Sequence, residues 1–213
     1  MKISMTLLIA MLILIFWTPL QAIFATEEPA FKVIEKIDTV EIREISEYWI
    51  VEIEIEGSQE EAGNKAFRTL LKYISGENTG SEKIEMTAPV NQQSKQTGEK
   101  IEMTAPVNQT QSEEGKFLVS FVLPERFNLR VPPQPKDDRL KLRKIEKSIR
   151  AVQEYSGTWS IDNFNENKKI LLDTLSRQDR WEISGAVQWS RYDAPFMPWF
   201  LRRNEVQVDL REK

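Results

Sequence analysis

The sequence predicts an α+β domain in which two pseudo-equivalent halves close one curved antiparallel sheet. Three observations support this: short segments of alternating apolar and polar residues, two amphipathic helical segments, and an order of strands, helix and strands that occurs twice. Each half is expected to hold about four strands and one helix, with the helices packed on the sheet. No linker-like stretch divides the 213 residues, so one folded domain is expected.

The first 25 residues form a separate unit. Lys2 gives a positive start, Met5–Trp17 is almost wholly apolar, and the small residues Ala22 and Ala25 follow. This pattern is typical of a secretory signal peptide cleaved after one of the alanines. An N-terminal membrane anchor is the alternative, although a spanning helix needs roughly 20 apolar residues. Both interpretations place the domain at 26–213 outside the cytoplasm, so the protein is expected to be periplasmic, secreted or membrane-anchored.

The first half of the domain is expected to contain three strands and a helix. The strands cover 33–37, 40–45 and 49–55, and the last alternates apolar residues with glutamates on its solvent side. Ser58 is a good N-cap, and acidic residues follow in the first turn of the helix. Apolar residues from Ala62 to Ile74 fall on one helical face, which predicts packing on the sheet.

A short segment then occurs twice. KIEMTAPVNQ stands at Lys83–Gln92 and again at Lys100–Gln109, which indicates a tandem duplication. Each copy is typical of a strand that ends in a proline-marked turn. Because the connector Asn91–Gly98 is polar, the copies are expected to pair as a hairpin at the rim of the sheet.

The second half is expected to repeat the order of the first. A proline-rich loop covers 131–138, Asp162 caps a second helix that runs to about Gln178, and an aromatic loop covers 193–198. Strands are expected over 117–123, 141–146, 148–155, 181–192 and 204–210.

Composition excludes several classes of function. The chain has no Cys and no His, which removes disulfides, thiolate metal sites, His-dependent triads and the commonest axial ligand of heme iron. The net charge is −4, whereas nucleic-acid binding needs a basic surface. No phosphate-binding loop, dinucleotide fingerprint or G-x-S-x-G motif is present. We therefore expect no catalytic residues, no metal site and no nucleic-acid partner.

Five segments, in the same order, resemble the SOUL heme-binding protein family. They are VEIREI at 40–45, FRTLLKYISGEN at 67–78, IEMTAPV in both repeat copies, FVLPER at 121–126 and RYDAPFMPWFLRRNEV at 191–206. The resemblance covers roughly Phe31 to Leu210. It implies a distorted antiparallel β-barrel of two pseudo-symmetric halves with two long helices, similar to effector-binding domains that hold amphipathic molecules.

The resemblance also implies non-covalent binding of heme or another tetrapyrrole. The implied cleft is shallow and hydrophobic and lies between the first helix and the loop near the C-terminus. Carried onto this sequence, the implied positions are Asn64, Phe67, Arg68, Leu71, Lys72, Tyr192, Phe196 and Met197. Phe67 and Leu71 would give the ring an apolar face, and a cation or amide on the helix would meet a propionate. Because a histidine proposed as iron ligand in some members has no counterpart here, any iron would be held by Met, Tyr or Lys, or have no protein ligand.

Three functions remain open at this point. The first is an exported tetrapyrrole-binding protein without enzymatic activity. The second is an envelope module that binds another protein and no small molecule, and the third is an enzyme acting on a tetrapyrrole or lipid. The hydrogen-bonding groups of Arg202–Glu205 favour buried pairing that fixes the last strand. Tyr192, Phe196 and Trp199 are interpreted either as a ligand clamp or as a loop packed on the barrel.

Overall fold

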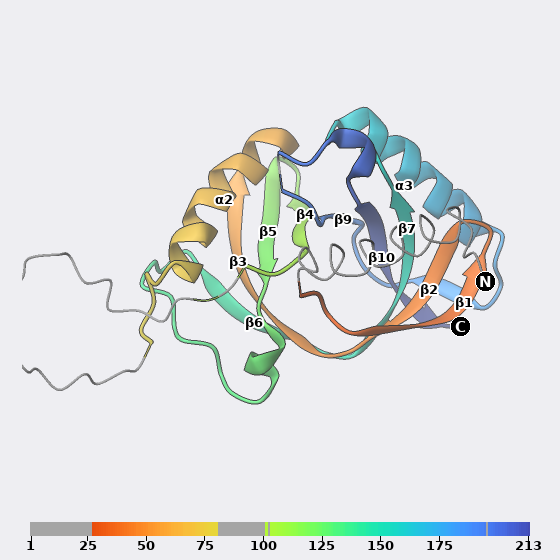
Figure 1. Cartoon of the computed structure of the whole chain (residues 1–213). Coiled ribbons are helices and arrows are strands. Elements are labelled where there is room, and N and C mark those ends of the chain that lie inside the picture. The colour runs from red at the N-terminus through yellow and green to blue at the C-terminus, as the bar shows by residue number, and fades with distance from the viewer. Residues whose placement is uncertain (1–26, 81–100, 102, 195) are drawn as a thin grey trace, which may run out of the picture.

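The computed structural model describes residues 27–80, 101, 103–194 and 196–213. Within them, ten strands form one curled antiparallel sheet, and two long helices cover its outer side (Figure 1). This is the predicted α+β fold, with the sheet curled into half a barrel. Along the chain the elements are β1 (Phe31–Ile37), β2 (Val40–Ile45), β3 (Tyr48–Glu56), α2 (Gln59–Ile74), β4 (Val107–Glu113), β5 (Lys116–Val122), η1 (Glu125–Asn128), β6 (Lys141–Ile145), β7 (Ser148–Tyr155), α3 (Ile161–Ser176), β8 (Trp181–Ile183), β9 (Gln188–Arg191), η2 (Trp199–Leu201) and β10 (Asn204–Glu212).

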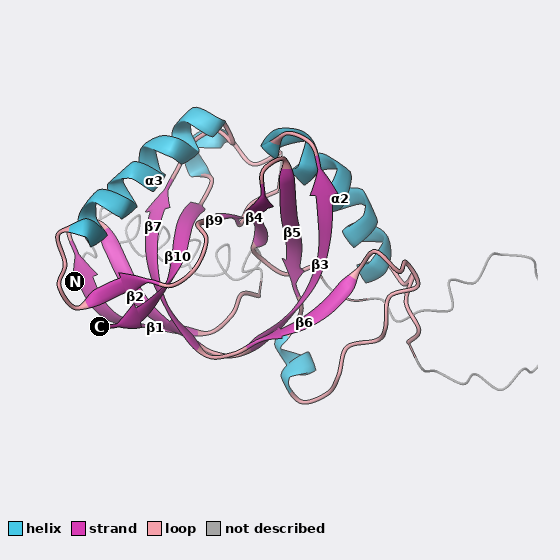
Figure 2. Ribbon diagram, turned by 180° about the vertical axis from the view of Figure 1, so that it is seen from behind, coloured by secondary structure: helices cyan, strands magenta, loops and turns pink. Residues whose placement is uncertain are grey.

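The strand order contains the two pseudo-equivalent halves. The sheet runs β1-β2-β7-β10-β9-β4-β5-β3-β6, and β8 pairs with β10. Strands β3, β5 and β4 on the α2 side correspond to β7, β10 and β9 on the α3 side (Figure 2). The halves meet where β4 pairs with β9. They also exchange one strand each: β2, from the first half of the chain, pairs with β7 on the α3 side, and β6, from the second half, pairs with β3 on the α2 side. This exchange explains why the sequence shows two halves but no domain boundary.

Each helix covers its own apolar core. Under α2, Leu70 and Tyr73 are buried against β3 and β5, and under α3, Leu171 is buried against strands that include Trp189. Each large apolar side chain buried in this way contributes about 1.5–3 kcal/mol. A smaller cluster around Tyr48 lies on the concave side, because successive side chains of a strand point to opposite faces.

The helix starts agree with the sequence in one case and differ in the other. Ser58 caps α2, and its hydroxyl accepts a hydrogen bond from the Glu61 amide at 3.3 Å. The predicted cap at Asp162 is wrong: Ser160 is the cap of α3 and accepts from the Asn163 amide at 3.3 Å. Ser160 has the extended backbone that a cap requires, whereas Asp162 already lies in the first turn.

The strand expected over 181–192 is interrupted. It divides into β8 and β9, which both pair with β10. Gly185 lies in the break, and a Cβ on it would stand 3.2 Å from a carboxylate oxygen of Asp209. The interruption therefore brings the backbone closer to β10 than most side chains allow.

The second repeat copy is only partly a strand. Ile101 is buried in the core under α2, and its amide donates to the carbonyl of Ile74 at 2.7 Å. The strand β4 begins at Val107 and is paired on both edges, by β5 and by β9. The part of the second copy that lies in β4, Val107–Gln109, thus pairs with β5 and β9 and has no free edge for the first copy. The first copy, and with it the rest of the expected hairpin, lies outside the described residues.

Candidate functional site

The outer surface of α2 carries three of the predicted positions. Asn64, Arg68 and Lys72 line an open hollow of about 510 Å³ together with Lys65 and Thr69. This volume lies within the range of about 300–1,000 Å³ that is usual for small-molecule sites. The cations along the helix suit an anionic group such as a carboxylate.

The two apolar helix positions face the core. Phe67 and Leu71 are half-buried and pack against the cluster under α2. The ring of Phe67 meets that of Phe121 edge to face, with centroids 5.4 Å apart. The structure thus brings Asn64, Arg68 and Lys72 together, while Phe67 and Leu71 support the helix from beneath.

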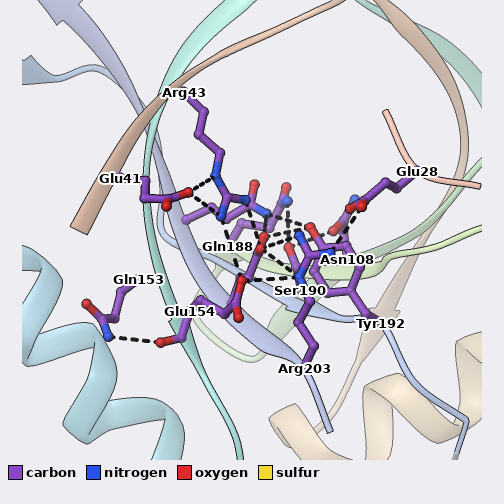
Figure 3. Close-up of polar contacts among 12 residues, drawn as sticks. Glu28, Glu41, Arg43, Asn108, Gln153, Glu154, Gln188, Ser190, Tyr192 and Arg203 are labelled. Atoms are coloured by element: carbon purple, nitrogen blue, oxygen red, sulfur yellow. Dashed lines mark hydrogen bonds and ion pairs between the residues drawn. The ribbon is translucent and has the colours of Figure 1, made fainter. Parts of the chain in front are cut away.

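Tyr192 belongs to a polar network on the concave side of the sheet (Figure 3). Its hydroxyl donates to Glu205 at 2.6 Å, and the same carboxylate accepts from Arg43 at 2.8 Å, Arg203 at 2.7 Å and Gln207 at 2.6 Å. Burial opposes the ionisation of Glu205, but the charges of Arg43 and Arg203 outweigh it and hold the pKa of Glu205 below its usual value. Burial and the neighbouring Glu205 charge raise the pKa of Tyr192.

This network closes the concave side. Arg43 also pairs with Glu41 at 2.8 Å, and Arg203 pairs at 3.0 Å with Glu28 of the segment before β1. The cavity that remains there, lined by Glu28 and Tyr192 among others, measures about 20 Å³, which is room for roughly one water molecule. A porphyrin does not fit into it. The pairing of Glu205 instead fixes β10, as the sequence of Arg202–Glu205 indicated.

The loop between β9 and β10, residues 192–203, is here called the aromatic loop, and it exposes a cluster of large apolar side chains. The exposed fraction is 86% for Phe196, 58% for Trp199, 59% for Phe200 and 62% for Leu201, while Met197 is half-buried. Figures 1 and 2 show this loop at the end of the molecule where α2 and α3 both begin. Isolated exposed apolar residues are common, but adjacent ones usually mark a binding surface.

The aromatic loop is held against the start of α3. The Gly157 amide donates to the carbonyl of Trp199 at 3.0 Å, and Arg202 lies over the ring of Trp159 at 4.4 Å from its centroid. Arg202 also donates through Nε to the carbonyl of Met197 at 2.8 Å. These contacts place a guanidinium at the base of the exposed apolar cluster.

Arg191, at the end of β9, is a second cation near this loop. Its Nη2 donates to the Gln109 side-chain oxygen at 2.7 Å, and its guanidinium carbon lies 5.7 Å from the Trp159 ring centroid. Burial lowers the pKa of Arg191 to about 10. Gly63 of α2 lies against the same guanidinium, so that α2, β9 and the segment before α3 that carries Trp159 meet here.

Sequence reasoning did not identify Arg191, Trp159 or Gly63. One signal was available, because a glycine inside an otherwise good helix usually has a packing reason. Among the described residues, no cluster of three or more His, Cys, Asp or Glu side chains is arranged to hold a metal. No described helix has both the length and the apolar character needed to cross a membrane.

Comparison with known families decides the relationship of the chain. The family model described as SOUL heme-binding protein matches residues 26–209. The chain belongs to the SOUL heme-binding protein family. For a SOUL protein the ligand class expected at the family level is heme, and the family match begins directly after the apolar N-terminal segment.

Solved structures support the fold of this SOUL protein. The C-terminal domain of EcmrR shares it with a TM-score of 0.57 and 9% identity, over 86% of this chain and 99% of that domain. A hydrolase from Listeria innocua shares it with a TM-score of 0.51 and 10% identity, over 92% of this chain and 98% of that one. At sequence identities this low, these structures show a common fold, and the activities of those proteins are not inferred for this chain. No curated protein matches the sequence significantly.

Proposed function

We propose that this SOUL protein is exported and binds heme or another tetrapyrrole non-covalently, without enzymatic activity. The proposed surface comprises the aromatic loop and the cations on the outer face of α2. The observation that carries the proposal is the exposed apolar cluster of Phe196, Trp199, Phe200 and Leu201, held next to cations in a heme-binding family. The apolar segment before residue 26 supports export, by cleavage or as a membrane anchor.

The chemistry of the surface fits such a ligand. A tetrapyrrole is a flat apolar ring that carries carboxylates on one edge. Trp199 and Phe200, whose rings meet edge to face at 5.5 Å, offer an aromatic surface on which a ring can stack. Arg202 and the cations of the α2 hollow offer partners for the carboxylates. Since the chain has no His and no Cys, the proposal rests on the ring and its carboxylates, and an iron-free porphyrin is expected to bind as heme does.

The experiment is a titration of hemin and of protoporphyrin IX into residues 26–213. Wild type is compared with a Trp199→Ser, Phe200→Ser double variant, and Leu129→Ser is the control, since Leu129 is 93% exposed and lies outside the aromatic loop. Two lost aromatic contacts at about 0.5–1.5 kcal/mol each predict roughly 5- to 150-fold weaker binding. A variant of Phe67 and Leu71 is less informative, because both residues support the core.

The outcomes separate the candidate functions. A saturable Soret change in wild type and control that weakens in the double variant supports the proposal. Equal binding in all three proteins places the ligand elsewhere. If wild type does not saturate, the exposed cluster is instead a surface for a protein partner, which was the second function left open by the sequence.

A further inference from the structure

Arg191 carries a charge that has no counter-ion among the described residues. No ion pair to a carboxylate of the described residues is formed, and the one side-chain acceptor that it reaches there is the neutral amide oxygen of Gln109. Its Nε is enclosed and has no hydrogen-bond partner among the described residues. The two other buried arginines of the sheet both have carboxylate partners: Arg43 pairs with Glu41 and Glu205 at 2.8 Å, and Arg150 pairs with Asp209 at 2.6 Å. A buried charge without a partner is unfavourable, so the missing ion pair and hydrogen bond at Arg191 require an explanation.

Two further hydrogen-bond donors lie next to Arg191. The indole N–H of Trp189 and the hydroxyl of Tyr155 are also enclosed. Burial raises the pKa of Tyr155 and the nearby indole opposes this rise, but neither group forms a hydrogen bond of good geometry in the described part of the chain. Trp189 is only 2% exposed, and its ring centroid lies 4.7 Å from the guanidinium carbon. Unpartnered donors beside a cation are complementary to an anion.

The fold keeps close access to this guanidinium from α2. A Cβ added to Gly63 would lie 2.9 Å from Nη2 of Arg191 and 3.3 Å from the side-chain oxygen of Gln109. Glycine in the middle of a helix is unfavourable, so its presence here is explained by the close approach. The guanidinium therefore occupies space that any other residue type on α2 would fill.

Arg191 is also connected to the aromatic loop. Trp159 lies under both guanidinium groups, with the carbon of Arg191 5.7 Å and that of Arg202 4.4 Å from its centroid. Both Arg191 and Trp159 keep partial exposure. A carboxylate on a short flexible arm can therefore approach Arg191 from a ring that lies on the loop.

We propose that Arg191 anchors one carboxylate of the ligand, which for a tetrapyrrole is a propionate. This inference rests on the proposed function, and it assigns the selectivity for ligands with a carboxylate to Arg191. Nη2 is engaged by Gln109 and Nε is enclosed, so Nη1 is the nitrogen that the guanidinium offers to a ligand, and a carboxylate is the monovalent anion that matches a single cation. A phosphate would bring a second charge, for which no further cation touches Arg191 among the described residues.

The test compares two ligands on matched proteins. Protoporphyrin IX and its dimethyl ester have the same ring, but the ester has no carboxylate. Both are titrated, by porphyrin fluorescence, into wild type, Arg191→Met and the control Arg211→Met, whose side chain is 65% exposed and pairs with Glu182 at the end of β10 away from the loop. We expect wild type and control to bind the free acid about 10-fold more tightly than the ester. Arg191→Met is expected to bind the ester as wild type does and to lose the preference for the acid.

Folding is followed separately, so that a damaged protein is recognised. Because Arg191 forms no ion pair with the described residues but donates one hydrogen bond to the buried Gln109, Arg191→Met is expected to have a lower melting temperature than wild type through the loss of that bond, and to unfold cooperatively. If it does not fold, Arg191→Lys keeps the charge without the planar fork and is expected to show a reduced preference. A preference that survives in Arg191→Met or is unchanged in Arg191→Lys overturns the anchor. If wild type binds neither porphyrin saturably, the proposed function itself fails, and the anchor with it.

Discussion

Replacing Glu205 by glutamine tests whether the concave network fixes the last strand. Glu205 is fully buried, and its carboxylate accepts hydrogen bonds from Arg43, Arg203, Tyr192 and Gln207. Glutamine keeps the shape of the side chain but removes the charge that compensates two guanidinium groups. One of its amide protons would also point at a donor.

The expected loss of stability follows from what the two arginines retain. Removing one partner of a buried ion pair costs about 3–5 kcal/mol. Arg43 keeps Glu41 at 2.8 Å and Arg203 keeps Glu28 at 3.0 Å, so a loss near the lower end, about 3 kcal/mol, is expected. With a urea slope of about 2 kcal/mol per molar, the unfolding midpoint falls by about 1.5 M.

Urea unfolding followed by tryptophan fluorescence measures this shift, and Tyr192→Phe is the matched control. That variant removes one hydrogen bond to Glu205 and leaves both ion pairs, so it should cost about 1–2 kcal/mol. The reasoning is refuted if the Glu205→Gln midpoint lies within about 0.3 M of wild type, a shift below 1 kcal/mol. It is also refuted if Tyr192→Phe is the more damaging change.

Three further outcomes are expected. The pKa of Glu205 is lowered in the folded state, so ionised Glu205 stabilises the fold at pH values above its unfolded pKa of about 4.3, and this stabilisation is lost as the pH falls through the folded pKa. The free energy of unfolding should therefore fall more steeply with acid in wild type than in Glu205→Gln. Deleting Asn91–Val107 leaves one copy of KIEMTAPVNQ, in which Ile84 takes the place of Ile101, so thermal unfolding should stay cooperative, and a broad transition would contradict this. Gly63→Ala should lower the melting temperature although alanine favours helices by about 1 kcal/mol, because the added methyl meets Arg191 at 2.9 Å; a rise would show that the guanidinium can move away freely.

The fold was predictable where short-range patterns decide it. Both helices and the doubled order of strands follow from periodicity, and Ser58 was identified as a cap from local chemistry. The errors arose where distant residues decide. Ser160 and Asp162 are both good capping types, and the break near Gly185 depends on Asp209 of another strand.

The candidate site was less predictable for the same reason. The family resemblance indicates which segments matter, but not which way a helix residue points. The side chains of Phe67 and Leu71 pack against the core, whereas those of Arg68 and Lys72 line the hollow on α2. The surroundings of Arg191 come from segments far apart in sequence, so no local pattern contains them.

The seam between the two halves supports the proposal that the ligand carboxylate binds on the helix side of the sheet. Where β4 pairs with β9, Asn108 faces Ser190, and on the concave side the serine hydroxyl donates to the asparagine at 2.8 Å. One residue along each strand, Gln109 and Arg191 point to the helix side, where the guanidinium finds an amide and no carboxylate among the described residues. At this seam the pleat thus separates the paired side chains of Asn108 and Ser190 from Arg191, whose Nε has no hydrogen-bond partner among the described residues. Since buried polar groups are normally paired, this difference supports the helix side of the seam as the proposed place for the ligand carboxylate.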